Sequence, residues 1–198
     1  MATIKQPVEV GLAGFLKNYR DDTDKADPLY IGIDPGAEGA VGLICGKYHF
    51  CFSIPTAKVV RGKKKTKKGN PMMMTVPDYQ GILDLFGLIN TVVIPADVRA
   101  CLEQSPPSMG PGRQYAEILL ARHYATWPLY LLSLGWSLEE VSPSKWKEAM
   151  GLSNKDKETG RQMAAKMFPR ANVSGDKGDK AEALLLAEWK RRLDNGGL

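Results

Sequence analysis

The sequence has no long uninterrupted hydrophobic run. Its most apolar stretch, residues 118–134, is broken by Arg122, His123 and Pro128, whereas a helix that spans a bilayer needs about 20 consecutive apolar residues. We therefore expect no membrane-spanning segment. Residues 1–27 also lack the apolar core of a signal peptide and contain acidic residues that transit peptides avoid. We expect a cytoplasmic protein without a cleaved leader, with an organelle as the alternative location.

Histidine and cysteine are also scarce. The only histidines are His49 and His123, and the three cysteines, Cys45, Cys51 and Cys101, follow no zinc-ligand spacing. With so few histidines and cysteines, a histidine-rich metal site or a Ser-His-Asp triad would have few residues to draw on. We expect the cysteines to be free, buried thiols in a reducing compartment. Any catalytic chemistry must therefore come from carboxylates.

Charge is abundant and unevenly distributed. The 198 residues include 27 Lys and Arg against 22 Asp and Glu, a net charge of +5, with 43% hydrophobic residues, which suits one globular domain. Residues 61–70, RGKKKTKKGN, hold six cations and no acid, so the remainder has a net charge of −1. We interpret this segment as a loop that contacts a phosphate backbone, with an ordinary solvated connection as the alternative. Its cations are Arg61, Lys63, Lys64, Lys65, Lys67 and Lys68.

Hydrophobic patterning predicts an α/β fold. Three strands in hairpin succession are expected first, then a helix with Pro77 in its first turn, a strand that ends at Glu103, a long helix, a fifth strand and three shorter helices. The expected strands are 29–34, 39–46, 47–54, 98–103 and 136–141, and the helices are 77–89, 114–134, 144–150, 155–168 and 179–193. This alternation predicts a mixed central five-stranded sheet flanked by helices. We assign residues 28–198 to this domain and 1–27 to an N-terminal extension with a short helix.

Carboxylates occur at the ends of several of these elements. Asp34 ends a strand in IGIDPG, Glu103 ends another in ACLEQS, and Asp179 and Glu182 share one face at the start of the last helix. Each acid alone has an ordinary explanation, as a turn residue or a helix N-terminal acid. Together they suit Mg²⁺ or Mn²⁺, and two such ions about 4 Å apart can drive phosphodiester hydrolysis. The residues therefore indicate a metal-dependent enzyme that acts on nucleic acid.

Five motifs together resemble a known family. IGIDPGAEGAVG, CLEQS before a glycine-rich loop, VSPSKWKEAMGL, NKDKETGRQMAAKMFP and DKAEALLLAEW occur in this order within residues 29–189. This region is similar to the RuvC-type Holliday-junction resolvases, with the chloroplast and phage branches closer than the typical bacterial enzyme. The resemblance implies a ribonuclease H-like fold, a homodimer, and paired nicks in a four-way DNA junction that depend on two metal ions per site.

The resemblance also implies roles for individual residues. Asp34, Glu103, Asp179 and Glu182 take the positions of the catalytic, metal-binding acids. The last position is usually Asp in bacterial members, so Asp176 is an alternative to Glu182. A basic residue near the site assists the reaction in the family, and Lys180 or Lys177 can serve here. DNA contacts are implied for Gln104, Ser105, Lys155, Lys157 and Arg161.

The sequence therefore predicts a structure-selective DNA endonuclease that resolves four-way junctions. One alternative is a ribonuclease H-like nuclease that cuts flaps, forks or RNA-DNA hybrids. Another is a junction-binding protein without catalytic activity. An actin-like nucleotide-binding protein would need a second phosphate loop, and we find none in the sequence.

Overall fold

The structure, a computed structural model, describes residues 6–22, 27–36, 39–65, 69–104, 114–173 and 178–198. A mixed five-stranded sheet forms its centre, with strand order β3-β2-β1-β6-β7. β1, β2 and β3 pair antiparallel, and β1, β6 and β7 pair parallel. The strands are β1 (Leu29–Asp34), β2 (Ala40–Cys45), β3 (Tyr48–Ser53), β6 (Val98–Glu103) and β7 (Ser137–Val141). The predicted fold class is confirmed.

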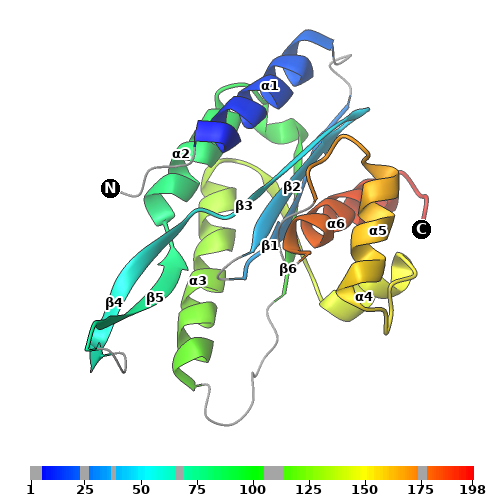
Figure 1. Ribbon diagram of the computed structural model, residues 1–198. Helices are drawn as coiled ribbons and strands as arrows, with labels where there is room; N and C mark the ends of the chain where they lie inside the picture. The colour runs from blue at the N-terminus through cyan, green and yellow to red at the C-terminus, as the bar shows by residue number, and fades with distance from the viewer. Residues whose placement is uncertain (1–5, 23–26, 37–38, 66–68, 105–113, 174–177) are drawn as a thin grey trace.

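Helices cover both faces of this sheet (Figure 1). One face carries α1 (Gln6–Asp22), α2 (Tyr79–Asn90) and α3 (Gln114–Ser133), and the other carries α4 (Pro143–Ala149), α5 (Lys157–Met167) and α6 (Asp179–Asp194). The layers form because each sheet face is apolar and is buried against apolar helix faces. Two hydrophobic clusters result, one on each side of the sheet. None of the helices described is long and apolar enough to cross a membrane.

The N-terminal helix α1 is part of the first of these clusters. Its residues Leu12, Phe15 and Leu16 are buried together with side chains of β1, β2 and α2. The helix lies along β3, the edge strand of the sheet. The three cysteines are buried thiols that form no disulfide, as the sequence predicts.

Residues 56–77 differ from the predicted loop and helix. β4 (Thr56–Lys65) pairs antiparallel with β5 (Pro71–Pro77) in a two-stranded hairpin that extends away from the main sheet (Figure 1). The prediction of a loop at Arg61–Lys65 is therefore wrong. This lysine-rich run lacks alternating apolar residues, but two strands can pair in a hairpin without them. Lys67 and Lys68 lie outside the described residues. Pro77 ends β5, and α2 begins after Asp78, whose side chain accepts a hydrogen bond from the Gly81 N–H.

Two glycines bring α6 unusually close to the sheet. A Cβ on Gly32 of β1 would lie 2.1 Å from the carbonyl oxygen of Ala183, and one on Gly42 of β2 would lie 2.6 Å from the Ala183 carbonyl carbon. No side chain fits at either position, so the backbone of α6 packs directly on the two strands. This contact fixes the start of α6 next to the end of β1.

Candidate metal centre

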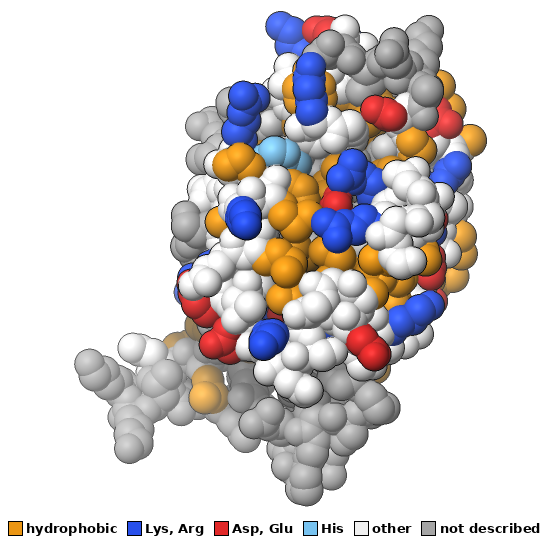
Figure 2. All heavy atoms as spheres, turned by 90° about the vertical axis from the view of Figure 1, so that its right-hand side faces the viewer, with side chains coloured by type: hydrophobic (Ala, Val, Ile, Leu, Met, Phe, Trp, Pro, Cys, Tyr) orange, Lys and Arg blue, Asp and Glu red, His pale blue; other side chains and the backbone are white. Residues whose placement is uncertain are grey.

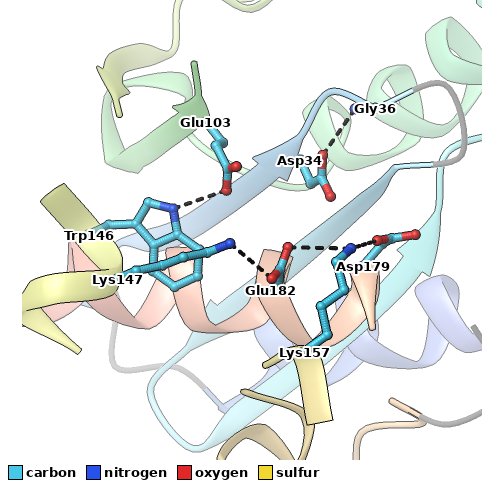
Figure 3. A network of polar contacts seen from close by, with 8 residues as sticks. All are labelled: Asp34, Gly36, Glu103, Trp146, Lys147, Lys157, Asp179 and Glu182. Atoms are coloured by element: carbon cyan, nitrogen blue, oxygen red, sulfur yellow. Dashed lines mark hydrogen bonds and ion pairs between the residues drawn. The ribbon is translucent and has the colours of Figure 1, made fainter. Parts of the chain in front are cut away.

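Three elements bring the four predicted acids together. The register of the parallel strands β1 and β6 places Ile33 opposite Leu102, so the following residues, Asp34 and Glu103, end neighbouring strands side by side. Asp179 and Glu182 lie in the first turn of α6. Figure 3 shows all four carboxylates gathered around one space. The sequence prediction that these residues form one cluster agrees with this geometry.

Three of the acids form a group that can hold a cation. Asp34, Asp179 and Glu182 each offer a carboxylate oxygen, and these oxygens lie within 4.8 Å of one another. Carboxylate oxygens are the ligands that Mg²⁺ and Mn²⁺ prefer, and nitrogen or sulfur ligands are not needed. The donor set therefore fits a hard divalent ion. Glu103 stands beside this group, and its Oε2 accepts a hydrogen bond from the Trp146 indole N–H at 3.0 Å.

Burial makes the ionised forms of these acids costly. Burial raises the pKa of Asp34 to about 6, and the negative charges of Asp179 and Glu182 also raise it. The N–H of Gly36, which donates to Asp34 Oδ1 at 3.0 Å, acts in the opposite direction and lowers this pKa. Burial likewise raises the pKa of Glu103 to about 7, with a further contribution from Asp34. Closely spaced carboxylates out of water favour either a proton or a cation among them. Positive charge next to these carboxylates therefore stabilises their ionised forms.

Two lysines supply part of that charge. Lys147 Nζ lies 3.0 Å from Glu182 Oε1, and Lys157 Nζ lies 2.8 Å from Asp179 Oδ1 and 3.8 Å from Glu182 Oε2. Burial alone would lower the pKa of Lys157, but its contacts with Asp179 and Glu182 raise it overall. The sequence motifs predict a DNA contact for Lys157 and do not single out Lys147, although it belongs to the motif VSPSKWKEAMGL. Both lysines compensate the negative charge of the cluster.

The other predicted site residues lie around this centre. Lys180 follows Asp179 in α6 and is half-buried, and Gln104 follows Glu103, with its backbone N–H donating to the Val141 carbonyl. Lys155 is exposed just before α5, and Arg161 pairs with Glu158 at 2.8 Å. The remaining predictions lie outside the described residues: Ser105, Asp176 and Lys177.

The face formed by α4, α5 and α6 carries mixed charge. Figure 2 shows lysine and arginine side chains spread over it, with acidic and hydrophobic side chains among them. Several of these cations pair within their own helix; for example, Arg191 and Arg192 both bind the buried carboxylate of Glu188. The described part of this face therefore shows no single basic stripe.

The sheet order and the flanking helices define an α/β protein with a fold of the RuvC type. The structure is similar to that of Thermus thermophilus RuvC in complex with Holliday junction substrate, with a TM-score of 0.50 and 13% sequence identity, covering 86% of this chain and 96% of that chain. A second Thermus thermophilus RuvC structure has a TM-score of 0.45 at 14% identity, covering 85% and 96%. No protein-family model and no curated protein sequence matches the chain.

Proposed function

We propose that the protein is a metal-dependent endonuclease that resolves four-way DNA junctions by paired nicks. The observation that carries this proposal is the group of carboxylates at the adjoining ends of β1, β6 and α6 on a RuvC-type fold. A solved structure with this fold is bound to a Holliday junction substrate, which supports branched DNA as the substrate class.

In this proposal the four acids bind metal ions, and two lysines stabilise negative charge. Asp34, Asp179 and Glu182 would hold one ion, and Glu103 with Asp34 would complete a second position (Figure 3). Mg²⁺ or Mn²⁺ bound there would supply an activated water and stabilise the leaving oxygen of a phosphodiester. Lys147 and Lys157 pair with the carboxylates of Glu182 and Asp179. Their positive charge would also stabilise the negative charge that a bound phosphate gains in the transition state. The β1–β6 register and the α6 packing keep this arrangement rigid.

In this proposal the hairpin β4–β5 binds the DNA backbone through its positive charges. Four of the six cations of residues 61–70 belong to β4, which extends from the body of the protein. Without residues 61–70 the chain has a net charge of −1, so the positive excess of the chain is concentrated in this short segment. Contacts to phosphates would make binding independent of sequence and sensitive to salt.

A homodimer would place two such sites on one junction. The outer side of α3 exposes Ile118, Leu129 and Leu132, which are 65%, 75% and 57% exposed. Their spacing of 11 and 3 residues places them on one helical face. Nearby, residues of α2 and α3 line an apolar hollow of about 170 Å³. Burial of this apolar face against the same face of a second copy would give a two-fold dimer, whose symmetry would match that of a four-way junction.

The decisive test is cleavage of a labelled four-way junction against a duplex, a flap and a fork of the same sequence. Wild type and Asp34→Asn are compared with Mg²⁺ and with Mn²⁺. Symmetric nicks in the junction alone, lost in the variant, support the proposal. Tight junction binding without cutting would identify a binding protein, and equal cutting of flaps and forks would identify a broader nuclease.

A further inference from the structure

The indole of Trp146 is buried in the core, yet its one polar atom points to the carboxylate cluster. Trp146 is 0% exposed and packs in the hydrophobic cluster between the sheet and α4–α6. Its Nε1–H donates to Glu103 Oε2 at 3.0 Å (Figure 3). An indole N–H donates only, so it can restrain a carboxylate without competing for a metal ion.

The position of this N–H is set by the pairing of β6 with β7 and by the start of α4 directly after β7. Glu103 is paired with Val141 in the parallel β6–β7 ladder. The next residue, Ser142, caps α4 by accepting a hydrogen bond from the Lys145 N–H, and Pro143 occupies the first turn. One turn later, Trp146 lies over the end of β6. The position of the indole therefore follows from strand register and a helix cap.

The same short helix restrains a second acid of the cluster. Lys147 lies with its Nζ 5.2 Å from the centre of the Trp146 ring and 3.0 Å from Glu182 Oε1 (Figure 3). Consecutive residues of α4 thus contact one acid from β6 and one from α6. With Oε2 of Glu103 held by the indole, the glutamate loses side-chain freedom that would otherwise have to be lost when a cation binds.

We propose that Trp146 is a positioning residue, which holds the Glu103 carboxylate in its metal-binding orientation through the indole N–H. This inference deepens the proposed function and depends on its assignment of Glu103 as a metal ligand. Groups that orient a metal ligand typically change metal affinity or activity about 10- to 100-fold when removed.

Trp127 offers a matched control on the opposite face of the sheet. It is 2% exposed, and its Nε1–H donates to His123 Nε2 at 3.3 Å. Replacement of either tryptophan by phenylalanine removes one buried N–H and leaves an aromatic ring. Thermal unfolding of Trp146→Phe and Trp127→Phe shows whether the two variants are equally folded before any functional comparison.

The hydrogen bond itself is tested by NMR of the indole N–H groups, of which the chain has four. Trp146→Phe removes and so assigns one resonance. Glu103→Gln should shift that resonance upfield, because a neutral acceptor makes a weaker bond than a carboxylate, and should leave the Trp127 resonance in place. A Trp146 resonance that Glu103→Gln does not move would overturn the proposal.

Metal binding and kinetics test the positioning role. By calorimetry with Mn²⁺ and no DNA, Trp146→Phe should bind the ion about ten-fold more weakly than Trp127→Phe. In junction cleavage, Trp146→Phe should need more Mg²⁺ and have a lower kcat, with KM for DNA unchanged. Equal Mn²⁺ affinity in the two variants would refute the inference even if wild type cuts junctions. Weaker Mn²⁺ binding by Trp146→Phe than by Trp127→Phe would support it even if wild type cuts no branched DNA, which would refute only the proposed nuclease.

Discussion

Gly32 of β1 lies directly against the backbone of Ala183 in α6, so closely that a Cβ at Gly32 would lie 2.1 Å from the Ala183 carbonyl oxygen. This contact joins the strand that ends at Asp34 to the helix that begins at Asp179. The distance between the carboxylates therefore depends on a position that has no side chain.

Gly32→Ala should push α6 from the sheet and separate Asp34 from Glu182. We expect a decrease of about 2 to 4 kcal/mol in the free energy of unfolding, because backbone atoms cannot move aside as a flexible side chain can, and a large decrease in Mn²⁺ affinity. Urea unfolding and calorimetry measure both effects. Gly87→Ala is the control, since a Cβ there meets nothing within 4 Å and alanine favours the helix. Equal stability of the two variants would contradict the close packing.

The burial of His123, which lies away from the carboxylate cluster, predicts that the stability of the protein depends on pH. The side chain is 2% exposed, and burial lowers its pKa from 6.5 to about 4. Between these two values the unfolded chain binds a proton that the folded protein does not, so stability is full above pH 6.5 and falls as the pH drops toward 4. We expect His123 to account for a decrease of about 2 to 3 kcal/mol in the free energy of unfolding between pH 7 and pH 4.

His123→Gln isolates this effect, because the glutamine oxygen can accept the hydrogen bond that Trp127 donates to His123. Urea unfolding of both proteins at several pH values gives the difference in their free energies of unfolding. That difference should change between pH 7 and pH 4. Parallel pH profiles would show that His123 stays uncharged in both states or titrates equally in them.

Charge reversal in β4 should weaken the salt dependence of DNA binding. Replacement of Arg61, Lys63 and Lys64 by glutamate should lower junction affinity and reduce the slope of log K against log salt, by about 0.9 for each phosphate that the protein no longer neutralises. Fluorescence anisotropy over a range of salt concentrations measures the slope. The variant Lys17→Glu/Lys166→Glu/Arg170→Glu reverses three exposed cations outside the hairpin and so controls for the same change in net charge. An unchanged slope would remove the hairpin from the DNA interface.

Leu129→Glu should produce a monomer. Leu129 is the most exposed large hydrophobic side chain of α3, at 75%, so the folded monomer tolerates a charge there while a buried dimer interface does not. Sedimentation measures the oligomeric state of this variant and of Val60→Glu, a control on the hairpin that is 55% exposed. A monomeric wild type, or a dimeric Leu129→Glu, would refute the α3 interface.

The fold and the acids of the site could be predicted because their signals are local. Period-two and period-3.6 patterns mark the five strands of the main sheet and its helices, and Asp34, Glu103, Asp179 and Glu182 each stand at an element end that the pattern itself reveals. The hairpin β4–β5 could not be predicted in this way, since its stability comes from pairing between two strands, and the composition of β4 alone indicates a charged loop.

The available carboxylates and the elements on which they lie follow from the sequence alone, since element type depends on short-range spacing. The surroundings of these carboxylates depend on how the elements pack. Strand register places Trp146 against Glu103, and the packing of α4 and α5 on α6 brings Lys147 and Lys157 to Glu182. The pairs Trp146–Glu103, Lys147–Glu182 and Lys157–Asp179 are 43, 35 and 22 residues apart in the sequence. Such contacts follow from the packing of whole elements, which local spacing does not specify.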